Sequence, residues 1–139
     1  MTALRPGEEN PEEFAQRFAA WAASGQYRPV SFASPLYEFS SGETVIFVFD
    51  RIPEFAPPGP AKVVIHAWAE EVLAASEPPG LTDLGGGRWR IAGQVEAILE
   101  APYWVLAAGI PVLIGGKPPA AVGQKLVVLS EPPLMGFRL

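Results

Sequence analysis

The clearest pattern in the chain is an alternation of apolar and polar residues between Arg88 and Glu100. Odd-numbered positions from Trp89 to Leu99 are apolar or small, while most even-numbered positions are charged or polar. A period of two residues indicates a β-strand with one face buried and the other in water. At about 3.3 Å per residue such a strand would reach roughly 40 Å, so we expect it to bend, with Gly93 as the site of a coil or bulge. The pattern predicts a small barrel or a strongly twisted sheet.

A second pattern, near the start of the chain, has the period of a helix. The aromatic residues that recur at this spacing are Phe14, Phe18 and Trp21. Asn10 suits the N-cap, Pro11 suits the first helical position, and Gly25 is placed to end the helix. We therefore expect an amphipathic helix over about residues 11–24, packed on the sheet through its aromatic stripe.

Proline and glycine divide the remaining chain, residues 27–139, into apolar runs that predict a β-rich body. The expected strands are 27–33, 36–40, 44–49, 62–69, 88–100, 103–108, 110–114, 124–129 and 134–139. Thr44–Phe49 is apolar at nearly every position, so we expect a central strand covered on both faces, one cover being the helix stripe. Residues 52–60 and 76–87 are expected loops. The pattern leaves open whether Glu70–Ala75 continues a strand or forms a helical turn.

These elements favour a mainly β protein of the α+β class, a small twisted antiparallel sheet or barrel with one N-terminal amphipathic helix. A chain of 139 residues is expected to form a single domain, residues 1–139. A pseudo-duplicated β-meander is an alternative architecture. The sequence Ser-Glu-Pro-Pro begins at both Ser76 and Ser130, and an aromatic–arginine pair begins at both Tyr27 and Trp89.

The last third of the chain resembles small five-stranded barrels of the oligonucleotide/oligosaccharide-binding (OB) type. The resemblance rests on the long strand that begins at Arg88 and on the glycine-containing segment Val122–Val128, which is similar to a late strand of such barrels. It covers about residues 88–139, at the level of fold and without a diagnostic motif. It implies a curved sheet whose cations and aromatic rings bind a single strand. The candidate ligand-binding residues are Arg88, Arg90, Tyr103 and Trp104.

Charge and composition narrow the functional classes. The net charge is −5, opposite in sign to the cationic field of a general nucleic-acid binder. The chain has no Cys and one His, so we expect no disulfide, no metal and no cofactor. The first residues lack an apolar signal-peptide core, and the run Tyr103–Ile114 is too short to span a membrane, so we expect a cytoplasmic protein. The 16 prolines fit either a thermophilic source or a GC-rich genome.

Few side chains have the setting of catalytic groups. His66 is a candidate general base, but no nucleophile motif lies near it, and a hydrogen-bonded core position explains it equally well. Glu70 and Glu71 would face opposite sides of a strand. Glu96 and Glu100 would share a face about 13 Å apart, beyond the roughly 5–9.5 Å of glycosidase carboxylates.

No motif identifies a function, and three hypotheses stay open. The first is a non-enzymatic interaction or assembly protein, a homo-oligomer or a partner of another protein, because the apolar runs 44–49 and 103–114 exceed what a small core can hide. The second is a β-barrel binding module for single-stranded nucleic acid or another small ligand. Its contact residues would be Arg88, Arg90, Tyr103 and Trp104. The third is an enzyme of unrecognised type centred on His66 or the Glu70 and Glu71 pair.

Overall fold

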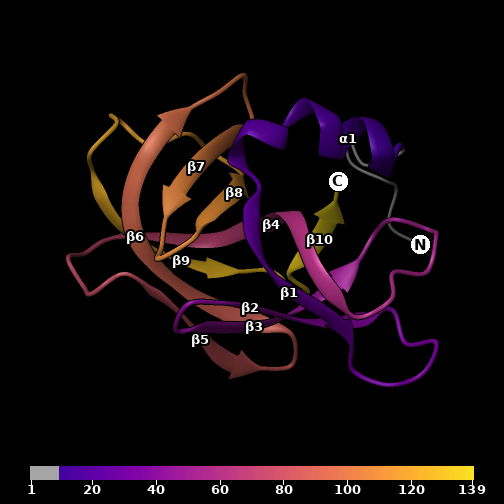
Figure 1. Cartoon of the computed structure of the whole chain (residues 1–139). Helices are drawn as coiled ribbons and strands as arrows, with labels where there is room; N and C mark the ends of the chain where they lie inside the picture. Colours follow the sequence, from indigo (N-terminus) through magenta and orange to yellow (C-terminus); the bar gives the residue numbers. More distant parts are fainter. Residues whose placement is uncertain (1–9) are drawn as a thin grey trace.

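The computed structural model describes residues 10–139, which form β-strands with one short helix packed at their edge (Figure 1). The opening residues, which entered the expectation of a cytoplasmic protein, lie outside the described range. Helix α1 spans Pro11–Arg17 and is followed by a 3₁₀ turn, η1, at Ala19–Trp21. The strands are β1 (Ala23–Pro29), β2 (Leu36–Ser41), β3 (Thr44–Asp50), β4 (Gly59–Ala74), β5 (Gly80–Gly85), β6 (Arg88–Ile98), β7 (Tyr103–Ala107), β8 (Pro111–Gly115), β9 (Lys125–Ser130) and β10 (Met135–Arg138). The mainly β class and the N-terminal helix are confirmed.

Five strands close a barrel, which we name the C-terminal barrel: β8, β7, β6, β9 and the second half of β4 (66–74). Strands β8, β7, β6 and β9 pair antiparallel in that order. β4 completes the circle by pairing with β8 in parallel and with β9 antiparallel. The barrel predicted from the sequence is therefore confirmed as a closed five-stranded one, while the likeness to OB-type barrels stays a prediction.

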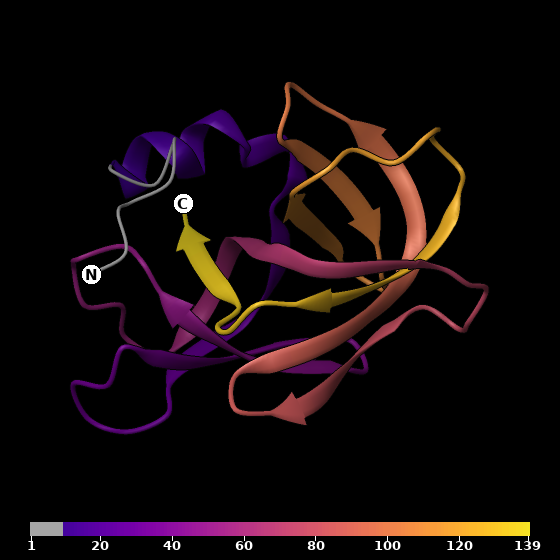
Figure 2. The same cartoon turned by 180° about the vertical axis from the view of Figure 1, so that it is seen from behind.

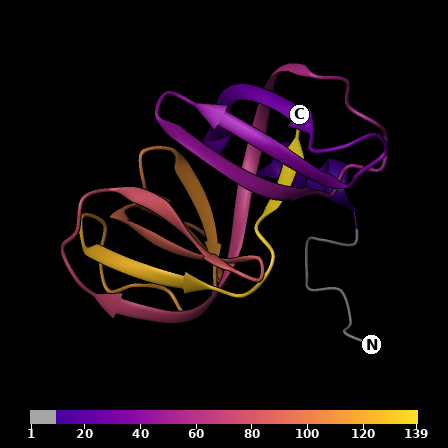
Figure 3. The same cartoon turned by 90° about the horizontal axis from the view of Figure 1, so that it is seen from below.

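The other strands repeat this arrangement in what we name the N-terminal ring: β1, β2, β3, β10 and the first half of β4 (59–66). β1, β2 and β3 form an antiparallel meander, β3 runs parallel to β10, and β4 pairs antiparallel with both β10 and β1. Figure 3 shows the ring and the barrel side by side, joined by β4. The two halves of the chain therefore exchange strands. The first half supplies the end of β4 to the C-terminal barrel, and the second half supplies β10 to the N-terminal ring.

The repeated halves share a Gly-Gln pair in their first strands. Gly25-Gln26 in β1 and Gly93-Gln94 in β6 occupy equivalent places, because each glutamine pairs both with the second meander strand and with the strand that closes the circle. A Cβ on Gly25 would lie 2.4 Å from a carbonyl oxygen of β2, and one on Gly93 would lie 2.2 Å from a carbonyl oxygen of β7. Both positions need glycine because two backbones approach each other there.

The two repeated sequence segments that suggested a duplication do not lie at structurally equivalent positions. Tyr27 is equivalent to Val95 rather than to Trp89, since each follows its Gly-Gln pair. The Ser-Glu-Pro-Pro segment at Ser76 follows the end of β4, whereas Ser130 ends β9, whose equivalent is the first half of β4. The pseudo-duplicated meander is present, with a register that the sequence alone does not reveal.

The alternation along β6 is confirmed. Its odd-numbered residues from Trp89 to Val95 are buried, while Arg88, Gln94 and Glu96 are exposed. β6 pairs with β9 up to Gln94 and with β7 from Gln94 onward, and a bulge follows Val95. The strand therefore bends at the Gly93 region, where the missing side chain allows it.

Several predicted boundaries differ from the structure. Helical structure ends at Trp21 because Gly25 belongs to β1 and does not cap the helix. Glu70–Ala74 continue β4 as a strand. The expected loop 76–87 contains β5, which forms a hairpin with β6. Gly85 takes the positive φ of this hairpin turn, which glycine adopts without strain. Among the described residues, no helix combines the length and the apolar character needed to cross a membrane.

Helix α1 packs on the sheet through the predicted stripe, but on a different strand from the one expected. Asn10 caps the helix by accepting a hydrogen bond from the backbone of Glu13 at 3.1 Å. Phe14 and Phe18 are buried in a cluster with Phe137 of β10 and residues of β4, β7 and β8. Figures 1 and 2 show α1 above β10 from both sides. The outer face of β3 is left without the cover that the sequence predicted.

Candidate functional site

The two arginines of the predicted ligand site are each paired with a carboxylate. Arg88 forms an ion pair with Glu70, one of the candidate catalytic carboxylates, and Arg90 forms one with Glu77. Both pairs lie at the surface. In each pair the glutamate carboxylate neutralises an arginine that would otherwise be free to face a phosphate backbone. The β6 surface is therefore not the cationic strip that single-strand binding requires.

The two aromatic residues of the predicted ligand site are in the core. Tyr103 is 2% exposed and packs against Phe14 and Phe18 of the helix, with ring centroids 5.7 and 5.0 Å away. Trp104 is fully buried in the larger core cluster. Stacking on a nucleobase needs an exposed ring face. Tyr103 and Trp104 therefore form no common surface with the arginines; alternation along β7 sends the two side chains to opposite faces, and both faces are covered.

His66 is a buried core residue of β4. Its Nδ1 donates to the carbonyl oxygen of Leu113 on β8 at 2.8 Å. The rings of Phe14 and Trp68 lie 5.3 and 5.1 Å from the imidazole. This environment gives the imidazole a structural role between two strands. Within residues 10–139, no three or more acidic, histidine or cysteine side chains gather closely enough to hold a metal ion.

One of the two apolar runs that the sequence predicted to supply an interface, 44–49, lies on the outer side of β2 and β3, whereas the other, 103–114, is mostly buried in the core. We define the β2–β3 face by four side chains, Leu36, Val45, Phe47 and Phe49, which are 37%, 52%, 38% and 37% exposed. The alternate residues of β3, Ile46 and Val48, are fully buried. The expectation that Thr44–Phe49 is covered on both faces is therefore wrong. The continuous apolar run was nevertheless the signal, because a strand with one wet face normally alternates.

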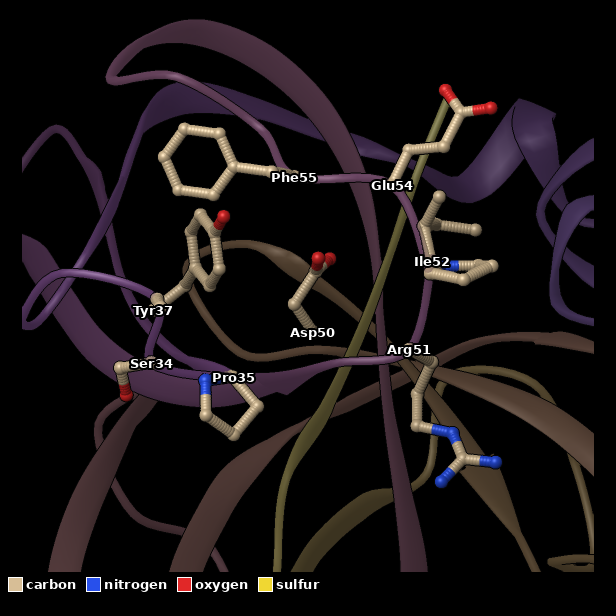
Figure 4. A pocket seen from close by; sticks show the side chains of 10 residues that line it. Ser34, Pro35, Tyr37, Asp50, Arg51, Ile52, Glu54 and Phe55 are labelled. Atoms are coloured by element: carbon tan, nitrogen blue, oxygen red, sulfur yellow. The ribbon is translucent and has the colours of Figure 1, made fainter.

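The β2–β3 face has polar side chains along one side and charges of opposite sign at its ends. Arg28 and Glu38 form an ion pair at 3.1 Å between β1 and β2. Glu43 lies in the exposed turn where β3 begins. Arg51 follows the end of β3, and its side chain points away from Asp50 (Figure 4). The Nε of Arg51 is buried without a hydrogen-bond partner among the described residues.

A small apolar cavity adjoins the same face. It has a volume of about 240 Å³ and is lined by Leu36 and Phe47 of the face, by Trp89 and Leu134, and by the glycine turn between β5 and β6. A side chain from a partner could enter beside Phe47. The face therefore combines exposed apolar area with a depression, the two features that interface hot spots share.

A second feature is a cluster of polar side chains at one end of the N-terminal ring. The hydroxyl of Tyr27 donates to Oδ1 of Asp50 at 2.9 Å, and Nε of Arg138 lies 3.6 Å from Oδ2. Burial raises the pKa of Asp50 even though Tyr27 and Arg138 favour its charged form. Burial, with the neighbouring charge of Asp50, raises the pKa of Tyr27. Asp50 is therefore an ionisable group whose charge is incompletely compensated.

No family model, no curated protein and no solved structure matches this chain. The fold is therefore the only basis for stating the class of protein. The structure defines a mainly β protein with a closed five-stranded barrel and one short N-terminal helix. A barrel hosts many unrelated functions, so the function must be argued from surfaces.

Proposed function

We propose that this protein is a non-enzymatic assembly protein whose copies associate through the β2–β3 face. The observation that carries the proposal is the exposure of four large apolar side chains on one sheet face, which is bordered by β5 and by the turn between β5 and β6. Contiguous exposed apolar patches mark interaction sites in soluble proteins. Two sheets pack face to face about 10 Å apart when their apolar faces interdigitate.

A second copy of this chain fits the face because the charges along β3 are self-complementary. The turn before β3 carries Glu43, and the residue after β3 is Arg51. A twofold axis through Phe47 would run the two β3 strands antiparallel. Glu43 would then meet Arg51 of the partner subunit, and Val45 would meet Phe49 of the partner subunit. Such an interface uses the same surface on both copies, as in most homodimers.

Arg51 is partly exposed, so a carboxylate on a second copy can approach the end of its guanidinium, although not the buried Nε. A carboxylate from Glu43 of the partner subunit would accept from this guanidinium, which stabilises the dimer and fixes its antiparallel register.

The other two hypotheses receive less support. Single-strand binding needs free cations and exposed rings, and the candidate side chains are ion-paired or buried. An enzyme centred on His66 would need a substrate to reach a fully buried imidazole.

Sedimentation velocity over a range of concentrations tests the proposal. Wild type should associate reversibly to a dimer. Phe47→Asp should be monomeric, because each protomer loses a central contact worth about 2 kcal/mol or more. Val72→Asp is the matched control, since Val72 is 39% exposed against 38% for Phe47 and lies on β4, away from the face. Circular dichroism checks that both variants fold. A wild type that remains monomeric at every concentration, or a Phe47→Asp variant that associates like wild type, would refute the proposal.

A further inference from the structure

The end of the N-terminal ring that contains Asp50 opens into a cavity of about 370 Å³ (Figure 4). We name it the ring mouth; the side chains used below are Tyr37, Asp50, Glu54 and Phe55. The end of β3 and the start of β2 meet at this edge, so residues 33–37 and 50–55 form the wall. Pockets of about 300–1,000 Å³ at the mouths of β-barrels are common small-ligand sites.

We propose that the ring mouth binds an organic cation, an ammonium or guanidinium group carried on an apolar body. Asp50 would be the counter-ion, and the exposed ring of Phe55 would contact the apolar body and the face of the cation, above a wall formed by the buried Tyr37. This site lies apart from the centre of the β2–β3 face, and the proposal holds whether or not the chain forms dimers.

The arrangement of charges at the ring mouth selects a cation over an anion. Figure 4 shows the Asp50 carboxylate pointing into the space beside the Tyr37 ring, with Glu54 at the rim. Arg51 also lines the cavity, but its side chain points to the opposite side of the strand. Arg138 of β10 forms an ion pair with Asp50 at 3.6 Å and offsets part of the charge of the carboxylate. Among the labelled ionisable side chains, Asp50 therefore presents its carboxylate to the cavity, while the Glu54 carboxylate extends outward from the rim.

The state of Asp50 also favours a cationic ligand. Its side chain is 5% exposed, and burial raises its pKa although Tyr27, Arg138 and the backbone of Ile52 act in the opposite direction. A cation in the cavity would stabilise the ionised carboxylate and lower that pKa. Binding should therefore tighten as the pH rises through the pKa of Asp50. The charged and titratable groups around Asp50 are Tyr27 of β1, Tyr37 of β2, Arg138 of β10 and, along the cavity wall, Arg51 and Glu54.

The wall of the ring mouth is held in place before any ligand arrives. The hydroxyl of Tyr37 donates to the carbonyl of Ala56 at 3.0 Å and accepts from its N–H at 3.1 Å. Ile52 is buried in the cluster beneath the helix. These two anchors leave Glu54 and Phe55 projecting between them, and Phe55 is 59% exposed. An exposed ring at the rim of a fixed cavity is suited to contact with a ligand.

The test is a titration of ¹⁵N-labelled full-length protein, followed by backbone amide shifts, with three probes of similar shape. Benzylamine is the cation, benzyl alcohol the neutral analogue and benzoate the anion. Benzylamine should cause saturable shifts confined to residues 33–37 and 50–55. Benzyl alcohol and benzoate should bind at least about tenfold more weakly, because they lack the charge that pairs with Asp50.

Variants separate the roles of the side chains. Asp50→Asn should weaken benzylamine binding about tenfold, and Phe55→Ala about threefold. Glu96→Gln, an exposed substitution on β6, is the control and should leave affinity unchanged. If Asp50→Asn does not fold, Phe55→Ala and Glu54→Gln decide, since both residues are exposed. Equal binding of benzyl alcohol, a preference for benzoate, no localised shifts up to the solubility limit, or unchanged affinity in every folded variant would overturn the proposal.

Discussion

Gly93 lies where β6 leaves β9 and begins to pair with β7. A side chain there would meet the carbonyl of Ala107 at 2.2 Å, and that oxygen cannot move without breaking the pairing of two strands. The alternating pattern and the glycine at its centre predict this bend, because both are properties of neighbouring residues. The cluster of Asp50 and Arg138 could not be anticipated, because the two residues are far apart in the chain and meet only through the parallel pairing of β3 with β10.

Gly93→Ala should lower the free energy of unfolding by about 2 kcal/mol or more, because the added Cβ overpacks against backbone. Gly80→Ala is the control: a Cβ at Gly80 meets nothing within 4 Å, so the change should stay within about 0.5 kcal/mol. Urea unfolding measures both. Equal stabilities for the two variants would show that the close approach at Gly93 is absent.

The pKa of Asp50 predicts the sign of a pH effect on stability. Because this pKa is raised in the folded state, the folded protein takes up a proton at Asp50 more readily than the unfolded chain, whose value is about 3.9. Asp50 therefore costs stability at neutral pH, and the cost is relieved as the pH falls through the raised pKa. Relative to Asp50→Asn, wild type should gain free energy of unfolding between pH 7 and pH 4 in urea titrations. A difference that is flat, or that shrinks toward acid pH, would contradict the burial of this carboxylate.

Among the secondary-structure elements, helix α1 and strand β3 show what local patterns can and cannot predict. The cap and the aromatic stripe of α1 follow from the sequence, because capping and helical spacing involve neighbouring residues. The strands that the stripe covers depend on the order of the whole sheet, and α1 packs on β10 and β4 rather than on β3. The uncovered β2–β3 face is the direct consequence.

Phe14→Ala tests the docking of the helix. Phe14 is 1% exposed and contacts the rings of Phe18, Tyr103 and Phe137. Its loss should reduce the free energy of unfolding by about 3–5 kcal/mol, through lost burial and a residual cavity. Gln16→Ala, at an exposed position of the same helix, should leave the urea midpoint nearly unchanged. A Phe14→Ala variant as stable as wild type would mean that α1 contributes little to the fold.

For the whole molecule, the structure consists of two similar halves that exchange a strand. The long strand β4 serves both the ring and the barrel, and β10 returns from the end of the second half to complete the first. Sequence reasoning predicted a barrel and allowed a duplicated meander. It could not assign the exchange, because pairings between residues distant in the chain leave no periodic signal. Within the ring, β3 keeps Val45, Phe47 and Phe49 partly exposed beside β5, where a second molecule can reach them.

The measurement that tests the proposed assembly most directly is sedimentation equilibrium of a charge-exchanged pair, Glu43→Arg and Arg51→Glu. Across the twofold axis each variant alone would place like charges in contact, so its self-association should weaken about tenfold or more relative to wild type. An equimolar mixture should form a heterodimer, because each altered side chain then meets an opposite charge. A wild type that stays monomeric, or a mixture that associates no better than its components, would contradict association through the β2–β3 face.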